Sequence, residues 1–376
     1  MKHFYIILLT LCLLLCACGK DSTETQPSTE PTETTEVTES TEHTEATEAT
    51  EPTDVTEGTE TTEPVVQYRH PLTGQLLEEA WIGQVNAIVI NNIQDALPHY
   101  GVSKADMIYE IETEGGITRM LALYTDFTDV GKIGPVRSDR SFFNNVAVSF
   151  DAPLFHCGGS RYGLNGNYDD SGNVIPNWKH IDARYYEGTY FFRDNDRYNL
   201  EGYAWEHTLF TDGGRAQKAL EQKALYQPVS RDFGLAFTEE SQLQGDTANE
   251  ITVTFRGGKT SRFTYNAETE LFDMSQYGKS YVDAEYDQQM SFKNVLVVYS
   301  DQWFIYDGTY NRSFYDLLGS GQGLAAIDGK VVPITWHRES LNDPFTYTLE
   351  DGSELILGVG KTYVAVASPI KPATYQ

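Results

Sequence analysis

Hydrophobic and polar residues in the first half of the chain alternate in a way that predicts strands. Residues 86–91 (NAIVIN) are an apolar run of strand length. Residues 105–114 and 117–127 read as two further strands on either side of Gly115 and Gly116. Because glycine tolerates positive φ, this pattern predicts a β-hairpin with a two-residue turn.

A helical period appears in two other segments of this half. Residues 138–150 carry apolar residues at helical spacing, and Ser138 is a suitable N-cap. Residues 215–225 predict a second helix. Between them, residues 160–199 are rich in Tyr, Asn, Asp and Gly, which favours long loops.

After residue 250 the pattern is almost entirely that of short strands in quick succession. Aspartate–glycine pairs separate several of them and are typical of tight hairpin turns. These pairs are Asp307-Gly308, Asp328-Gly329 and Asp351-Gly352. The second half is therefore predicted to be mostly antiparallel sheet.

These patterns predict an α/β (α+β) fold in two domains. Both faces of the predicted hairpin carry apolar residues, so we expect an N-terminal layered sandwich of sheets and helices. A β-rich C-terminal domain follows it. The polar segment 241–249 separates the two, which predicts domains at residues 66–240 and 250–370.

Residues 1–17 read as a signal peptide. An apolar run from residue 4 to 15 follows Lys2 and is shorter than the ~20 residues of a spanning helix. Leu15-Cys16-Ala17 before Cys18 resembles a bacterial lipobox, which implies cleavage before Cys18 and attachment of lipid, such as palmitate, to its thiol. We therefore expect an extracytoplasmic protein anchored by lipid to the outer face of the bacterial cell membrane. A plain signal peptide is the alternative.

Residues 18–65 are of low complexity, rich in Thr, Glu and Pro. An acidic residue recurs at every third position from residue 30 to 63, with almost nothing apolar to bury. Such a segment cannot form a core, and like charges extend it. We expect a disordered tether between the anchor and the globular part; an acidic tail without a role is the alternative.

Charge and cysteine content exclude two other classes of protein. The chain has 55 acidic and 27 basic residues, a net charge of −28, which argues against nucleic acid as a partner. After signal cleavage and lipidation only Cys157 remains of the four cysteines, so no intramolecular disulfide is expected. The globular part must be held together by its core.

The predicted hairpin places three glutamates at alternate positions. A two-residue turn would set Glu112 opposite Arg119, with Glu110 on the same face beside apolar residues. One interpretation is a cross-strand ion pair on a half-exposed sheet. The other is that Glu110 and Glu112 line a polar cleft, where buried carboxylates need cationic partners. The candidate partners are Arg119, Arg137 and Arg140.

The segment IGPVRSDRSFF (133–143) suggests an anion site. Free amide groups at the helix start, with Arg137 and Arg140 beside them, would attract an anion; alternatively, these arginines only pair with the hairpin glutamates. Opposite charges side by side suit a zwitterionic ligand, such as a cell-wall peptide or a loop of a partner protein. The expected ligand-binding residues are Glu110, Glu112, Arg119, Arg137, Ser138, Arg140, His156 and Ser160.

An enzyme is the alternative, with Cys157 and His156 or paired carboxylates in the reaction. HCGGSR (156–161) contains the residue types of an L,D-transpeptidase signature, but in a different order. The order matters because the histidine base must point at the sulfur atom, whereas neighbouring residues on a strand point to opposite faces. His180 or His207 could act as the base instead. A small buried thiol is the simpler interpretation of Cys157.

No cofactor or metal is expected. The sequence lacks HExxH, GxSxG and a Walker loop, and the glycines of residues 319–323 favour an ordinary loop. Glu110, Glu112, Asp139 and His156 could gather a divalent ion, but the nearby arginines would oppose it.

Several motifs together resemble the YerB-like lipoprotein family. They are HPLTG (70–74), NAIVINN (86–92), ADMIYEIETEGGITR (105–119), IGPVRSDRSFF (133–143), HCGGS (156–160), EHTLFTD (206–212), IYDGTYNR (305–312), ITWHR (334–338) and VGKTYVAV (359–366). The resemblance implies a layered α/β domain of unknown function, a smaller C-terminal domain and a place in the cell envelope. It implies no reaction, only a link to cell-wall synthesis or remodelling, with cell-wall synthesis proteins as expected partners. Leu97-Pro98-His99 and His337 depart from the family pattern.

The preferred hypothesis is therefore a tethered envelope lipoprotein that binds or regulates rather than catalyses.

Overall fold

The computed structural model describes residues 67–165, 167–168, 174–175 and 179–376. The predicted signal peptide (1–17), the lipidation of Cys18 and the tether (18–65) lie outside the described residues. Within the described part, no helix is both long enough and apolar enough to cross a membrane.

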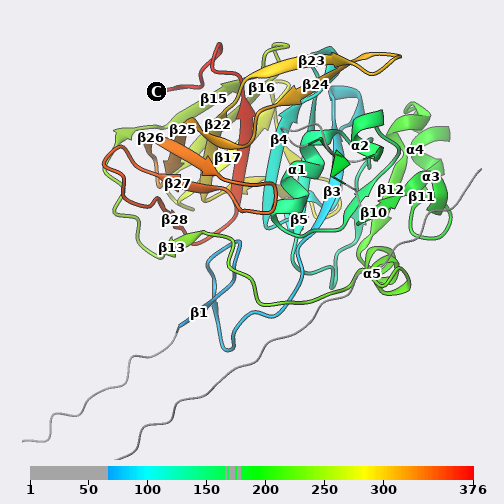
Figure 1. Ribbon diagram of the computed structural model, residues 1–376, viewed down its shortest axis with the longest axis horizontal. Coiled ribbons are helices and arrows are strands. Elements are labelled where there is room, and N and C mark those ends of the chain that lie inside the picture. The colour runs from blue at the N-terminus through cyan, green and yellow to red at the C-terminus, as the bar shows by residue number, and fades with distance from the viewer. Residues whose placement is uncertain (1–66, 166, 169–173, 176–178) are drawn as a thin grey trace, which may run out of the picture. The chain divides into compact units, whose positions relative to one another are not determined.

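In the described part of the chain, eleven strands form one mixed central sheet (Figure 1). β27 (Thr346–Thr348) pairs with β26 beside the main order. From one edge to the other the remaining strands are β10 (His180–Asp182), β7 (Leu154–His156), β3 (Asn86–Asn92), β5 (Thr118–Tyr124), β4 (Met107–Glu112), β29 (Thr362–Ala367), β22 (Asn294–Tyr299), β25 (Gly319–Ile327), β26 (Lys330–Arg338) and β14 (Asp246–Thr247).

Strands from both halves of the sequence lie in this one sheet. β4, from the first half, pairs in parallel with β29, near the end of the chain, from Met107 opposite Thr362 to Ile111 opposite Val366. The polar segment 241–249 contains β14, which pairs with β26 and forms the far edge of the central sheet. The domain limits 66–240 and 250–370 stay a prediction, and the sheet crosses between them.

Helix α1 (Ser141–Ser149) packs on one face of the central sheet (Figure 1). Its apolar residues recur every three or four positions, so Phe142, Phe143 and Val146 point together into a core with sheet residues such as Leu121. The helix begins later than predicted. Arg140, not Ser138, is its N-cap, with extended backbone and no capping side-chain bond.

A second sheet covers the opposite face. Phe263 of this sheet packs against Tyr363 of the central sheet, with ring centroids 4.8 Å apart. Its strands are β18 (Lys279–Ser280), β17 (Leu271–Gln276), β16 (Thr260–Asn266), β15 (Glu250–Thr254), β30 (Thr374–Tyr375) and β21 (Ser291–Phe292). The predicted α+β class, layered in its first half and β-rich in its second, is confirmed.

The same face of the first half is covered by α5 and a small sheet. α5 (Gly213–Gln222) buries Ala216, Ala219 and Leu220, close to the helix predicted at 215–225. The small sheet consists of β11 (Phe192–Arg193), β12 (Leu209–Asp212) and β6 (Lys132–Ile133). The region predicted as loops also holds the short helices α2 (Arg161–Asn165), α3 (Ala183–Tyr186) and α4 (Asn195–Asn199).

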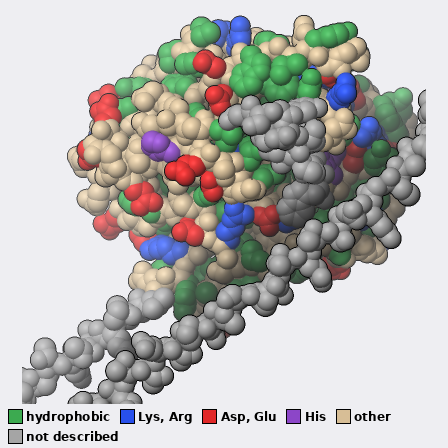
Figure 2. All heavy atoms as spheres, viewed as in Figure 1, with side chains coloured by type: hydrophobic (Ala, Val, Ile, Leu, Met, Phe, Trp, Pro, Cys, Tyr) green, Lys and Arg blue, Asp and Glu red, His purple; other side chains and the backbone are tan. Residues whose placement is uncertain are grey.

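The remaining strands form small two-stranded sheets. One of them, β23 (Gln302–Tyr306) with β24 (Asn311–Tyr315), exposes Trp303, Phe304 and Tyr306. Figure 2 shows hydrophobic side chains gathered at the top of the visible face, over this hairpin. The others are β1 (Tyr68–Arg69) with β2 (Leu76–Leu77), β13 (Ala236–Thr238) with β28 (Ile356–Gly358), β19 (Val282–Asp283) with β20 (Gln288–Gln289), and β8 (Asn167–Tyr168) with β9 (Val174–Ile175).

The β4–β5 hairpin differs from the prediction by one residue of register. Its loop has three residues, Glu114–Gly116, closed by a hydrogen bond from the amide of Thr113 to the carbonyl of Ile117. Glu112 therefore lies opposite Thr118, and Arg119 lies opposite Ile111. The predicted two-residue turn and the predicted pairing of Glu112 with Arg119 are wrong. A shift of one residue moves a side chain to the other face of a sheet.

Candidate functional site

The observed register separates the predicted carboxylates from the predicted guanidinium groups. Glu110 and Glu112 extend toward the second sheet, where they bond to residues 257–261. Arg119 extends to the other side, where it bonds to Ser138 near the start of α1. The sequence-based cleft that joins both glutamates to Arg119 is therefore wrong. Two polar clusters take its place.

The first cluster surrounds Glu110, which is fully buried. Its carboxylate pairs with the ammonium group of Lys259 and accepts a hydrogen bond of 2.7 Å from Asn92. The hydroxyl groups of Thr118 and Ser261, each at 2.5 Å, and of Tyr363 complete the shell. Burial acts to raise the pKa of Glu110, but Lys259 and the hydroxyl donors outweigh it and hold the pKa below its usual range. Both carboxylate oxygens of Glu110 therefore accept hydrogen bonds within the protein, while the side-chain oxygen of Asn92 has no partner.

Glu112 lies beside that cluster, and its hydrogen bonds are to a backbone amide and a tyrosine hydroxyl rather than to a cation. Its Oε2 accepts a hydrogen bond of 2.9 Å from the amide of Gly257. Its carbonyl accepts another of 3.0 Å from the hydroxyl of Tyr315. These bonds hold the β15–β16 turn and β24 against the end of β4.

The second cluster contains the three predicted arginines. Arg119 extends from β5 and is only 5% exposed. Its Nη1 donates to the carbonyl of Ser138 at 2.6 Å, while its Nε has no partner. Burial, and then the nearby charges of Arg140 and Arg137, lower the pKa of Arg119 well below its usual range. No carboxylate of the described residues lies within ion-pair distance of it.

The other two arginines each have a carboxylate partner. Arg140 forms a two-pronged pair with Glu114, with Nε–Oε distances of 2.9 and 2.8 Å. Arg137 is bonded to Glu206 at 2.5 Å and is a quarter exposed, so the cluster reaches the surface there. The prediction that the arginines pair with hairpin glutamates holds for Arg140 alone.

Asp139 is fully buried and lies near Arg119 and Arg140. One carboxylate oxygen accepts a hydrogen bond of 2.6 Å from Asn144, and the other has no partner. Burial raises the pKa of Asp139 well above its usual range, which favours the neutral form. Ser160 is adjacent: its amide donates to the carbonyl of Asp139, and its hydroxyl accepts from the amide of Gly163. The cluster therefore keeps an excess of positive charge.

His156 and Cys157 do not face each other as an enzyme pair would. Nε2 of His156 lies 2.6 Å from Nδ1 of His180, and Nδ1 of His156 lies 2.9 Å from the carbonyl of Gly158. Cys157 is half-buried, and burial raises the pKa of its thiol. His207, the other base considered, contacts Asn91 and Glu206. Of the predicted site residues, Glu110, Glu112 and His156 lie outside the arginine cluster.

The structure gives no support to a divalent metal ion in the described residues. Glu110 and Glu112 are on the opposite side of the central sheet from Asp139, whose neighbours are arginines. Among the described residues, no group of three or more His, Cys, Asp or Glu side chains is placed to hold a metal ion.

The sequence patterns did not predict two ion-pair partners, Lys259 for Glu110 and Glu206 for Arg137. Lys259 precedes a strand far along the chain, and only its single charge beside the alternating pattern of 260–266 distinguishes it. Glu206 lies in EHTLFTD, beside a histidine that was considered as a base. In both cases the contact joins segments distant in sequence, which local patterns cannot pair.

Comparison with known proteins gives matches along most of the chain. Residues 72–226 match "Protein of unknown function (DUF3048) N-terminal domain", and residues 251–364 match the corresponding C-terminal domain. The chain is 26% identical over 312 residues to "Putative lipoprotein YerB" of Bacillus subtilis (strain 168), covering 81% of this chain and 87% of that protein. It also resembles a crystal structure of the YerB protein from Bacillus subtilis, with a TM-score of 0.66, 25% identity and coverage of 82% of this chain and 99% of that chain.

Proposed function

The chain belongs to the YerB-like family, and from this premise we propose that it is a lipid-anchored envelope protein that binds an anionic or zwitterionic ligand at Arg119, Arg137 and Arg140. The relative's name supports a lipoprotein-like role. The lipobox-like residues before Cys18 support the anchor, and residues 18–65 would serve as its tether.

One observation carries the binding proposal: the buried guanidinium group of Arg119 lacks an anionic partner. A buried charge is costly unless it is paired and hydrogen-bonded, and leaving one unpaired costs about 3–5 kcal/mol. A ligand carboxylate or phosphate would supply the missing acceptor, since guanidinium groups match such anions with two parallel bonds. Arg137, the most exposed of the three arginines, marks the route by which an anion would enter.

The surrounding carboxylates favour a ligand with both charges. Glu206 is half-exposed next to Arg137, and Glu114 is partly exposed next to Arg140. A free α-amino group or a lysine side chain would find these acids beside the arginines. This arrangement suits a cell-wall peptide or a loop of a cell-wall synthesis protein, as proposed from the sequence.

The geometry favours binding over catalysis. A nucleophilic cysteine needs a lowered pKa, because the thiolate is the reactive form, whereas burial raises that of Cys157. Glu110, the strongest carboxylate candidate, is enclosed by Lys259 and hydroxyl groups and has no free face for a substrate.

Calorimetric titration with acetyl-Ala-Ala as the free acid tests the binding site. We expect heat of binding for the free acid, about tenfold weaker binding for the C-terminal amide, and a similar loss in Arg137→Ala. Arg262→Ala is the matched control, because Arg262 is an exposed arginine with a carboxylate partner on the second sheet. Equal affinity of wild type and Arg137→Ala for the free acid would refute the site.

A separate experiment tests the anchor. Cys18→Ala should move the protein from the membrane fraction to the soluble exported fraction, whereas Cys16→Ala should leave it in the membrane. Retention of the Cys18 variant in the membrane would refute lipid anchoring at that residue.

A further inference from the structure

A cavity of about 760 Å³ lies between segments from both halves of the chain. Its walls come from residues 94–98 after β3, 201–207 before β12 and 276–282 around β18. This volume is within the range of small-molecule sites, which runs from about 300 to 1,000 Å³. The arginine cluster does not line it.

Gln276 is the decisive residue of this cavity. It ends β17, on the same buried face as Phe272 and Met274, so its side chain points inward. The residue is only 3% exposed, and neither its amide nitrogen nor its amide oxygen has a hydrogen-bond partner. Buried amides in proteins are normally paired, because an unpaired one loses its bonds to water without replacement. This side chain offers donors and acceptors that nothing in the described chain uses.

The hydroxyl groups of two tyrosines that line the cavity are already hydrogen-bonded within the protein. The hydroxyl group of Tyr277 donates to the carbonyl of Asn92 at 2.7 Å, and that of Tyr203 donates to the carbonyl of Leu97 at 2.8 Å. Their rings therefore serve as walls rather than as polar contacts. Asp95 and Lys279, both exposed, add charges of opposite sign at the rim.

His207 adds a neutral polar wall. It is buried, and its Nδ1 lies 3.0 Å from the amide nitrogen of Asn91, whose amide oxygen is also unpaired. Burial, followed by the opposing effect of Glu206, leaves the pKa of His207 below its usual value, so its ring is neutral at neutral pH. None of the described residues that line the cavity carries a buried charge.

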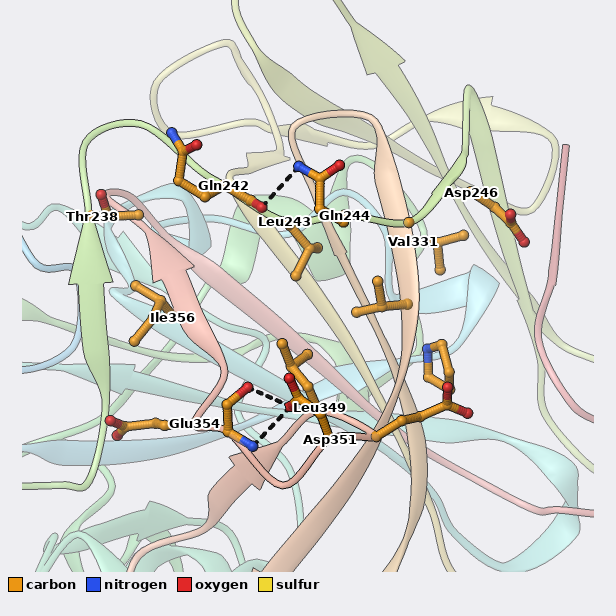
Figure 3. A pocket seen from close by; sticks show the side chains of 15 residues that line it. Thr238, Gln242, Leu243, Gln244, Asp246, Val331, Leu349, Asp351, Glu354 and Ile356 are labelled. Carbon is orange, nitrogen blue, oxygen red and sulfur yellow. Dashed lines mark hydrogen bonds between the residues drawn. The ribbon is translucent and has the colours of Figure 1, made fainter.

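A larger cavity, of about 910 Å³, is less informative. It lies against β26 and β28, and Figure 3 shows Leu243, Val331 and Ile356 among its lining side chains. Among the described residues, none of those that line it has a buried polar atom without a partner. Its described lining therefore has no buried polar atom whose missing partner a ligand would supply.

We propose that the cavity around Gln276 binds a short peptide, with a backbone amide of the peptide paired to the side-chain amide of Gln276. A peptide group presents one donor and one acceptor, which matches the unused donor and acceptor of a glutamine amide. The tyrosine rings supply flat walls for the peptide, and the rim accepts charges of either sign. This site is separate from the arginine cluster, and its test uses an uncharged probe, for which the cluster has lower affinity than for the free acid.

The test is titration of the full chain with acetyl-Ala-Ala-amide, followed by NMR or calorimetry. We expect saturable binding to the wild type and at least tenfold weaker binding to Gln276→Met, which keeps the side-chain length but removes the amide. Gln288→Leu, at an exposed glutamine of β20, is the control and should bind as the wild type does. The analogue with an ester in place of the central amide lacks the donor and should bind about fivefold more weakly or worse.

Thermal unfolding provides an independent readout. Removal of an unpaired buried amide should leave the melting temperature of ligand-free Gln276→Met equal to that of the wild type or raise it by about 2–4 °C. If the Met variant does not fold, Gln276→Leu replaces it. Absence of binding to the wild type, or equal binding by wild type and a folded Gln276 variant, would overturn the proposal.

Discussion

At the scale of single residues, the strongest constraint is the buried pair of Glu110 and Lys259. Both side chains are almost inaccessible, and they join the central sheet to the second sheet. Such a pair contributes little net stability compared with apolar residues, but removal of one partner leaves an isolated buried charge. The pair therefore selects one arrangement of the two sheets.

Glu110→Gln should destabilise the protein by about 3–5 kcal/mol at pH 7, because Lys259 loses its counter-charge. The pKa of Glu110 is lowered on folding from 4.5, so its contribution is complete above pH 4.5 and is lost as the pH falls through the lower folded value. The difference between the two proteins should therefore shrink below pH 4.5. Urea unfolding at several pH values measures it.

A matched control comes from the partly exposed pair of Glu250 and Arg262. Glu250→Gln should cost less than about 1 kcal/mol, as exposed pairs do. An equally small cost for Glu110→Gln would show that the buried pair does not hold the two sheets together.

His99 is a second buried titratable residue, but it is held in its neutral form, whereas Glu110 is held in its charged form. His99 is fully buried, with Nε2 2.6 Å from the carbonyl of Asn91 and Nδ1 2.5 Å from the hydroxyl of Tyr281. These contacts fit a neutral ring that donates through Nε2 and accepts at Nδ1. Burial lowers the pKa of His99 to about 3.

Protonation of His99 should contribute to acid unfolding. The folded pKa of about 3 is below the ordinary 6.5, so its stabilising effect is complete above pH 6.5 and declines as the pH falls toward 3. His99→Gln removes this titration. Between pH 6 and pH 4 the wild type should lose up to about 1.4 kcal/mol per pH unit more than the variant. Parallel stability profiles for the two proteins would contradict this assignment.

At the scale of elements, the β4–β5 loop decides which side chains face which layer. Gly115 and Gly116 both have positive φ, at 80° and 73°, which allows the three-residue loop. A Cβ on Gly116 would lie 2.8 Å from the Cα of Gly257, whereas one on Gly115 would meet nothing within 4 Å. The loop therefore packs directly against the β15–β16 turn.

Substitution of the two glycines should separate these effects. Gly115→Ala should cost about 1 kcal/mol for its backbone conformation alone. Gly116→Ala should cost about 1–3 kcal/mol more, because its Cβ pushes the two backbones apart. Chemical unfolding of both variants measures the difference. Equal costs would mean that the loop moves away from Gly257 without loss.

At the scale of the whole molecule, one sheet unites the two halves of the chain. The parallel pairing of β4 with β29 buries Ile108 and Tyr109 in the middle of the central sheet. The pair of Glu110 with Lys259 and the contact of His99 with Tyr281 also cross between the halves. Each half alone would expose a long apolar strand edge.

Residues 66–240 expressed alone should therefore not unfold cooperatively. Without β29 the edge of β4 is open, and without Lys259 the charge of Glu110 is unpaired. Calorimetry should show a cooperative transition for residues 66–376, none for residues 66–240, and recovery when residues 241–376 are co-expressed. A sharp transition of residues 66–240 by themselves would show that the two predicted domains fold independently.

The local features of this protein follow from short-range patterns in its sequence. Apolar runs such as residues 86–91 predicted strands, the helical spacing of Phe142, Phe143 and Val146 predicted α1, and the two glycines predicted a turn after residue 114. Each of these depends on interactions between residues near one another in the chain, which propensity and periodicity record. The same holds for the lipobox-like residues before Cys18 and the acidic low complexity that follows.

The hairpin register and the partners of the buried charges depend on contacts between segments that are distant in the sequence. Loops of two and three residues suit the same glycine pair, and in the folded chain the three-residue loop packs Gly116 against Gly257. That choice moves Arg119 away from Glu112 and leaves Glu110 to Lys259, some 149 residues away along the chain. A sequence pattern shows that a buried carboxylate needs a cation, and only the folded chain brings one particular cation to it.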